Sequence, residues 1–482
     1  MSTGAVPGTT LWVALPLAGV LAWLGVRIVR RATRSEVYPL IARVMIASVI
    51  LHLVCAPLQI FVVDHFYGGV ADWLRYQHQG ALLADMWRNG HFQLAGSGVN
   101  GIVGNGSVSI AGGVVMTLVG PDQLAAFFLC SWLAFVGCLF FYLAFRVTFP
   151  RADRRWYAVL VFLFPSLLFW TADVSKEAFM LLGLGLTAYG IALVMTGGRS
   201  GYLYAVAGSA LALLIRPDEI VILAAGFALA MLLRAFRGRA DAFRRPRHPF
   251  TMAAAFVFVA AAVIISGYEA AHFLHSLTGQ GITSGLSKVA SNNKGTGPGF
   301  GSSSVPYSSN PLWYPRDIYT LLFDPSPFTA HSLTQVFAAA ENTLIGLVIV
   351  FSLIPRLRYL PRVCLQRPYV LAALFYSAVF LYIFAALGNL GLITRERTLL
   401  LPLLFVVLAF PVARPGAEPY PWQRRSQRGS MRVPSSVGLR GAGDEAEAAT
   451  VVVASTTAEW MAAERPNTDG SRWSVAQWDP QD

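Results

Sequence analysis

The sequence predicts an all-α fold, a polytopic bundle of about eleven transmembrane helices. The first reason is composition, because 482 residues that are 55% hydrophobic and 13% charged are too apolar for a water-soluble globule. The second is that apolar runs of about 20 residues, the length that crosses the hydrocarbon of a bilayer, recur along the chain. The third is that arginine accumulates in alternate loops between these runs, as it does in cytoplasmic loops.

The predicted spans share an apolar composition and end at charged or turn-forming residues. They cover residues 10–29, 40–63, 123–147, 156–172, 177–196, 201–216, 219–236, 250–268, 334–354, 369–391 and 397–412. The first span has no positively charged segment before it and is followed by Arg30, Arg31 and Arg34. We therefore predict a retained anchor and not a cleaved signal peptide.

The arginine distribution also predicts the orientation. The loops near 151–155, 234–247 and 356–367 hold arginine clusters and are assigned to the cytoplasm, which places the N-terminus outside and the C-terminus inside. The net charge of +12 follows from these loops, so we expect no nucleic-acid partner. Arginine far outnumbers lysine, which is typical of GC-rich bacterial genomes, and the expected location is a bacterial plasma membrane.

Two predicted outer loops are too long to be simple connections. Loop 64–122 contains an amphipathic stretch from Trp73 to Trp87, expected to form an interfacial helix, and a Gly/Ser/Val-rich part, 97–115, that is a candidate re-entrant segment. Loop 269–333 contains a Gly/Ser/Asn-rich stretch near 291–310. We predict one multi-span domain over 1–412 and a disordered cytoplasmic tail over 413–482, where hydrophobicity falls sharply.

The first candidate site lies just outside the second span, in the stretch Asp72-Trp-Leu-Arg75-Tyr76. This pattern, with the later Gly90-His-Phe step, resembles the first outer loop of GT-C glycosyltransferases such as lipid A aminoarabinose transferases and protein O-mannosyltransferases. In those enzymes an acidic residue is followed four positions later by a tyrosine. The resemblance implies that Asp72 is the general base that deprotonates an acceptor hydroxyl. The alternative is that Asp72 only caps the helix that follows.

Four further residues complete this candidate region. Asp64, at the end of the second span, is the reserve candidate for the base. Tyr76, His78 and His91 are expected to line the site, and the two histidines lack the spacing of metal ligands. We therefore predict no metal-ligating residues and no certain cofactor, and we leave a requirement for a divalent metal open.

A second group of residues carries positive charge on the predicted outer side. Lys176, beside Glu177, follows the turn between two spans, where a lysine needs a partner or a bound anion. Arg395 and Arg397 flank Glu396 at the predicted entrance to the last span, and guanidinium groups bind phosphate through paired hydrogen bonds. We predict that these three cations, with Arg216, bind the phosphate of a donor. Local ion pairs, or snorkelling of the arginines, are the alternatives.

The resemblance implies a function as well as a fold. We expect a membrane glycosyltransferase that moves a sugar from a polyprenyl-phosphate-linked donor to a cell-envelope glycan or lipid acceptor on the outer face, with membrane lipids as its surroundings. The nearest alternative is an O-antigen-type polysaccharide polymerase or ligase. A lipid-linked glycan transporter or flippase, and a scaffold for an envelope complex, are alternatives from other classes.

Overall fold

The computed structural model describes residues 10–66, 69, 71–150, 152–236, 314–384 and 390–412. Within these ranges all regular structure is helical, which confirms the predicted all-α class. The predicted span 250–268, most of loop 269–333 and the tail 413–482 lie outside the described residues.

The helices follow one another with short connections. They are α1 (Leu11–Ala32), α2 (Pro39–Phe66), α3 (Asp72–Arg88), α4 (Asn105–Val119), α5 (Gln123–Thr148), α6 (Arg155–Leu163), α7 (Pro165–Phe169), α8 (Lys176–Thr196), α9 (Gly201–Ile215), α10 (Pro217–Phe236), α13 (Tyr314–Phe323), α14 (Leu333–Leu353), the 3-10 helix η2 (Ile354–Tyr359), α15 (Leu360–Gln366), α16 (Pro368–Phe384) and α17 (Leu390–Ala409).

Five helical segments are long and apolar enough to cross a membrane: Leu11–Ala32, Pro39–Phe66, Gln123–Thr148, Lys176–Thr196 and Leu333–Gln366. They coincide with five of the predicted spans. Three shorter apolar helices, α4, α9 and α16, have 15, 15 and 17 residues. A membrane location is therefore compatible with the helices of this structure.

Two predicted spans differ in detail from the helices observed. The span 156–172 is interrupted between α6 and α7, because Pro165 lacks a backbone N–H and Phe164 before it is extended, with φ −72° and ψ 129°. The last span was predicted to begin at residue 397, yet α17 begins at Leu390. Arg395 and Arg397 consequently lie inside a helix and not at its entrance.

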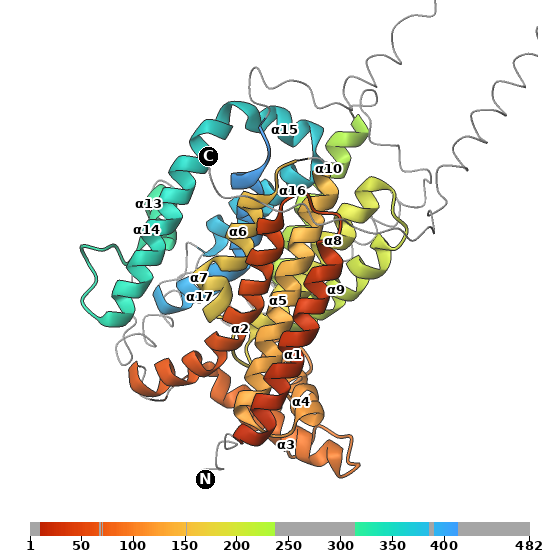
Figure 1. Cartoon of the computed structure of the whole chain (residues 1–482), viewed down its shortest axis with the longest axis vertical. Coiled ribbons are helices and arrows are strands. Elements are labelled where there is room, and N and C mark those ends of the chain that lie inside the picture. The colour runs from red at the N-terminus through yellow and green to blue at the C-terminus, as the bar shows by residue number, and fades with distance from the viewer. Residues whose placement is uncertain are drawn as a thin grey trace, which may run out of the picture. The chain divides into compact units, whose positions relative to one another are not determined.

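The centre of the bundle is formed by α5 and α8, which pack on each other through glycines. A Cβ atom on Gly137 of α5 would lie 2.6 Å from the Leu181 backbone of α8, and one on Gly190 of α8 would lie 2.6 Å from the Gly201 carbonyl oxygen of α9. Small residues of this kind let apolar helices approach closely where the surrounding lipid supplies no hydrophobic driving force. Figure 1 shows α3 and α4 at one end of this bundle and α15 at the opposite end.

The predicted interfacial stretch 73–87 forms helix α3, which packs on α4 as a hairpin. The buried residues of α3 are Trp73, Tyr76, Gln77, Gly80, Leu83 and Ala84. A Cβ atom on Gly80 would lie 3.0 Å from the Gly112 backbone of α4, so the two helices approach at a glycine contact. The buried face thus centres on Gly80, whereas Leu82, predicted to face the apolar side, is 38% exposed.

A buried acid ties the short loop between α1 and α2 to the arginine-rich end of the bundle. Glu36 accepts hydrogen bonds from Arg154 Nη2 at 2.6 Å and from the Tyr142 hydroxyl at 2.7 Å. Arg146 lies 3.7 Å from the same carboxylate. Two of the end arginines therefore hold structure together in addition to setting topology.

The predicted sidedness gives a direct labelling result. Cysteine introduced by Asp85→Cys, at an exposed position of α3, should react with an impermeant maleimide in intact cells, whereas Arg358→Cys in η2 should react only after permeabilisation. The four native cysteines are buried, so background labelling should be low. Labelling of both positions in intact cells, or of Arg358→Cys alone, would contradict the orientation.

Candidate functional site

Three charged side chains from distant parts of the chain converge at the α3–α4 end of the bundle. Arg395 of α17 donates from Nη1 to Asp72 Oδ2 at 2.8 Å and from Nε to Glu177 Oε1 at 2.7 Å. Asp72 begins α3 and Glu177 lies in the first turn of α8. The contact joins residues separated by 323 positions, so the fold brings together an acid and a cation that the sequence placed at the same membrane boundary.

The two carboxylates on Arg395 differ in their access to solvent. The side chain of Asp72 is 64% exposed, that of Arg395 is 17% exposed, and that of Glu177 is fully buried. The N-cap residue of α3 is Ala71, which provides no side-chain cap, and the Asp72 carboxylate is directed to Arg395. Asp72 is therefore the carboxylate of this group that an external hydroxyl can reach.

A second ion pair lies behind the first. Both terminal nitrogens of Arg216 contact the two carboxylate oxygens of Glu396, and Arg216 is also 3.8 Å from Glu219. Glu219 in turn accepts a hydrogen bond from the Tyr376 hydroxyl at 2.5 Å. Sequence reasoning treated Arg216 as part of a self-contained turn and did not select Glu396 or Tyr376. The only local signal for Glu396 was an acid placed between two arginines.

Arg397 points to a different part of the bundle from Arg395. Residues two apart on an α-helix are rotated by about 200° around its axis. Arg397 Nη1 donates to Asn342 Oδ1 at 2.7 Å and to the Leu322 carbonyl oxygen at 3.2 Å, while Nη2 lies 3.7 Å from Glu341. Its Nε and Nη2 donate no hydrogen bond among the described residues. The two arginines therefore do not form one clamp.

Lys176 is the cation of this region with uncommitted donors. It starts α8 and is partly buried, and in the described part of the chain no carboxylate lies within ion-pair distance of it. The charges of Arg216, Glu396, Glu177 and Arg395 all act on its ammonium group. By contrast, Arg395 and Arg216 are already paired with carboxylates.

Tyr76 lies beneath Asp72 on the inner face of α3. Its hydroxyl donates to Asn105 Oδ1, the first residue of α4, at 3.0 Å. Burial, followed by the negative charge of Asp72, raises the pKa of Tyr76 to about 12. Tyr76 is therefore a neutral hydroxyl that fixes α3 to α4 below the exposed acid.

The remaining predicted residues lie near this end of the bundle without joining the cluster. Asp64 is exposed close to the end of α2, His78 is half-buried on α3, and His91 is exposed after it. Among the described residues, none of the three is bonded to Asp72, Arg395 or Glu177. In the same ranges no group of three His, Cys, Asp or Glu side chains is arranged to hold a metal ion.

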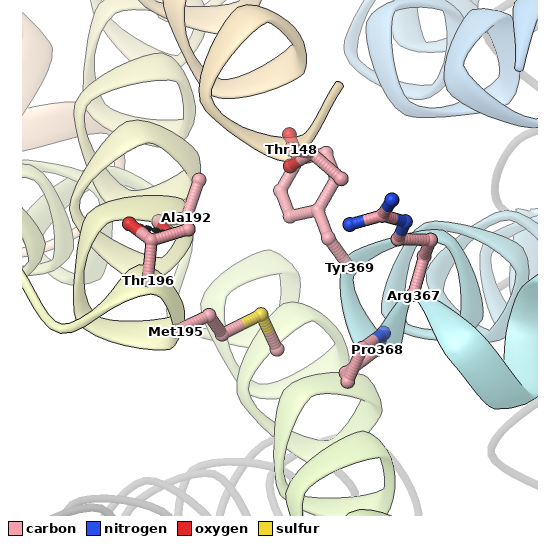
Figure 2. Close-up of a pocket in the computed structure, with 7 residues that line it drawn as sticks. All are labelled: Thr148, Ala192, Met195, Thr196, Arg367, Pro368 and Tyr369. Carbon is pink, nitrogen blue, oxygen red and sulfur yellow. Dashed lines mark hydrogen bonds between the residues drawn. The ribbon is translucent and has the colours of Figure 1, made fainter. Parts of the chain in front are cut away.

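Two cavities lie elsewhere in the bundle. Figure 2 shows a pocket of about 10 Å³ lined by Thr148, Ala192, Met195, Thr196, Arg367, Pro368 and Tyr369. It has room for about one water molecule and lies at the far end of α8 from Lys176. A larger groove of about 370 Å³ runs along α14 and is lined by Pro327, Ala330, Val336, Ala339, Ala340 and Thr343. Neither cavity contains the charged cluster.

Comparisons with protein-family models, curated proteins and solved structures found no match to this chain. The candidate site is therefore interpreted from its own geometry.

Proposed function

We propose that this chain is a GT-C-type membrane glycosyltransferase with about eleven spans. It moves a sugar from a polyprenyl-phosphate-linked donor to a cell-envelope glycan or lipid acceptor at the outer face of a bacterial plasma membrane. The observation that carries the proposal is the exposed carboxylate of Asp72, held 2.8 Å from Arg395 with the buried Glu177 on the other side of the guanidinium. An oriented, accessible acid beside unpaired positive charge is what transfer from a phosphate leaving group requires.

The proposed reaction assigns one role to each of three side chains. Asp72 accepts the proton of the acceptor hydroxyl as its oxygen bonds to the anomeric carbon. The bond from that carbon to the phosphate oxygen breaks, and both electrons leave with the phosphate. Lys176 stabilises the phosphate because its ammonium donors are uncommitted. Arg395 orients Asp72 through their hydrogen bond.

The other two predicted phosphate ligands take different positions in this proposal. Arg216 is committed to Glu396 and supports the site from behind, where it lies close to Arg395 along the chain of buried charges. Arg397 retains two unpaired donors, Nε and Nη2, which form one edge of its guanidinium. That edge suits an oxyanion, while Nη1 holds Leu322 and Asn342.

A deletion strain provides the direct test. We expect mass spectrometry of the cell envelope to show a glycan or lipid that lacks one sugar, together with accumulation of the polyprenyl-phosphate sugar. Accumulation of complete lipid-linked repeat units would instead indicate a polymerase or ligase. A donor trapped on the inner leaflet would indicate a transporter, and an unchanged glycan profile would contradict all three enzymatic or transport functions.

Lys176→Met should weaken binding of an anionic isoprenoid such as farnesyl phosphate by about tenfold, because a charged hydrogen bond to phosphate is lost. Isothermal titration with the purified protein in micelles measures this change. Arg199→Met, an exposed cation beyond the opposite end of α8, is the matched control and should bind as the wild type does. Equal affinities of the Lys176→Met and wild-type proteins would remove Lys176 from the phosphate site.

A further inference from the structure

A buried acid lies close to the charged cluster without a cation of its own. Asp173 stands in the turn between α7 and α8 and is 5% exposed. Its Oδ2 accepts a hydrogen bond from Gln59 Nε2 of α2 at 3.2 Å. Among the described residues its Oδ1 has no hydrogen-bond partner, and no cation lies within 4 Å of either oxygen. A charged carboxylate in such a place is strongly disfavoured, whereas a protonated one is tolerated.

The neighbouring polar atoms also favour a proton at this position. Gln59 Oε1 and Glu177 Oε2 are buried acceptors, and neither receives a hydrogen bond from a described residue. An ionised Asp173 would add a further acceptor to this group. A protonated Asp173 instead adds an O–H donor, which reduces the imbalance between donors and acceptors.

The charged and titratable groups around Asp173 come from three helices. Arg395 of α17 and Glu177 of α8 act on the Asp173 carboxyl, and the Cys130 thiol of α5 feels its charge. Burial raises the pKa of Asp173 to about 7, and the opposing effect of Arg395 is smaller because that guanidinium already serves two carboxylates. The group therefore titrates near neutral pH.

We propose that Asp173 is a proton-binding site, distinct from the Asp72 base, and that its protonation controls how much net positive charge Arg395 and Lys176 present to an anionic ligand. With Asp173 protonated, Arg395 faces two carboxylates. With Asp173 ionised, a third negative charge acts on the same guanidinium. The consequence for donor binding rests on the proposed function, whereas the proton site itself does not.

Infrared difference spectroscopy tests the proton site directly. Titration of the purified protein through neutral pH should show the carbonyl stretch of a protonated carboxyl disappearing with a midpoint at about pH 7. Isotopic labelling of aspartate carboxyls should shift the band, which separates Asp173 from buried glutamates. The band should be absent in Asp173→Asn and retained in Asp153→Asn, because a hydrogen bond from Arg155 lowers the pKa of Asp153 and keeps it ionised. A band that persists in Asp173→Asn, or no aspartate band in the wild type, would overturn the proposal.

Thermal stability gives a second readout with a defined sign. Asp173 binds its proton more tightly in the folded protein, with a pKa of about 7, than in the unfolded chain, where the pKa is about 3.9. The stability it contributes is therefore present below about pH 4 and is lost as the pH rises to about 7. Asp173→Asn lacks this loss, so its advantage in thermal midpoint over the wild type should be larger at about pH 8 than at about pH 5. A constant difference across this range would contradict a titrating Asp173.

Farnesyl phosphate binding tests the link to the candidate site. Its affinity for the wild type should fall by roughly tenfold as the pH rises through about 7, the change produced by one pKa unit of coupling. Asp173→Asn should remove this fall, apart from the change caused by the titration of the ligand itself. A parallel fall in both proteins would refute the control of binding by Asp173. Absence of all binding, with the infrared band present, would instead refute the proposed function and leave the proton site established.

Discussion

Asp72→Asn should reduce glycosyl transfer by about 10²–10⁴-fold and leave the protein folded. Asparagine keeps the shape of the side chain and can accept a hydrogen bond from Arg395, but it cannot take the proton of an acceptor hydroxyl. Asp72 is 64% exposed, and ion pairs at exposed positions contribute only about 0–1 kcal/mol to stability. Loss of activity at normal expression therefore reports on chemistry and not on folding.

The measurement is complementation of the glycan defect in the deletion strain, supported by thermal midpoints of the purified variants. Asp85→Asn is the matched control, because Asp85 is exposed on the same helix and lies beyond the cluster. Asp64→Asn tests the reserve base in the same assay. A fully active Asp72→Asn protein would exclude Asp72 from the mechanism and leave Asp64 as the candidate base.

The convergence of Asp72 with Arg395 illustrates what the sequence could predict. Span lengths and arginine alternation place both residues at one membrane boundary, although 323 positions separate them. A pattern of this kind locates the end of the bundle at which a side chain lies. It does not specify which helix lies beside it, so the partner Glu177 of Arg395 was recognised only as a neighbour of Lys176.

The pairing of Arg216 with Glu396 illustrates what could not be predicted. The partners are 180 positions apart, and the closer acids Asp218 and Glu219 made a local ion pair the simplest interpretation. Tertiary packing of α17 against its neighbours decides the pairing, and no periodicity in the sequence encodes it. The divergence of Arg395 from Arg397, in contrast, follows from helical geometry once α17 is known to begin at Leu390.

The outline of α3 was predictable and its rotation was not. Hydrophobic periodicity from Trp73 to Trp87 predicts a helix with one apolar side, and α3 covers that stretch. Its buried face is set by the glycine contact at Gly80, where the missing side chain allows α4 to approach. A scale that scores glycine as nearly neutral gives no weight to this contact.

Arg397→Met should lower the free energy of unfolding by about 3–5 kcal/mol, the loss found when one partner of a buried charged group is removed. Arg397 is 1% exposed and joins α17 to α13 and α14 through Leu322 and Asn342. The substitution leaves these acceptors without their donor and moves the nearest cation away from Glu341. Thermal unfolding in micelles measures the loss, and Arg358→Met, at an exposed site in η2, should change it by less than about 0.5 kcal/mol.

Arg397→Lys separates the structural role of this residue from ligand binding. Lysine keeps the positive charge but cannot reproduce the guanidinium fork, so donor binding should weaken more than folding if the unpaired edge of Arg397 binds phosphate. Farnesyl phosphate affinity and thermal midpoint are then compared in the same preparation. A large fall in thermal midpoint with unchanged affinity would assign Arg397 to the packing of α17 alone. The phosphate would then be held by Lys176, the cation of the cluster whose donors are not committed to another side chain in the described part of the chain.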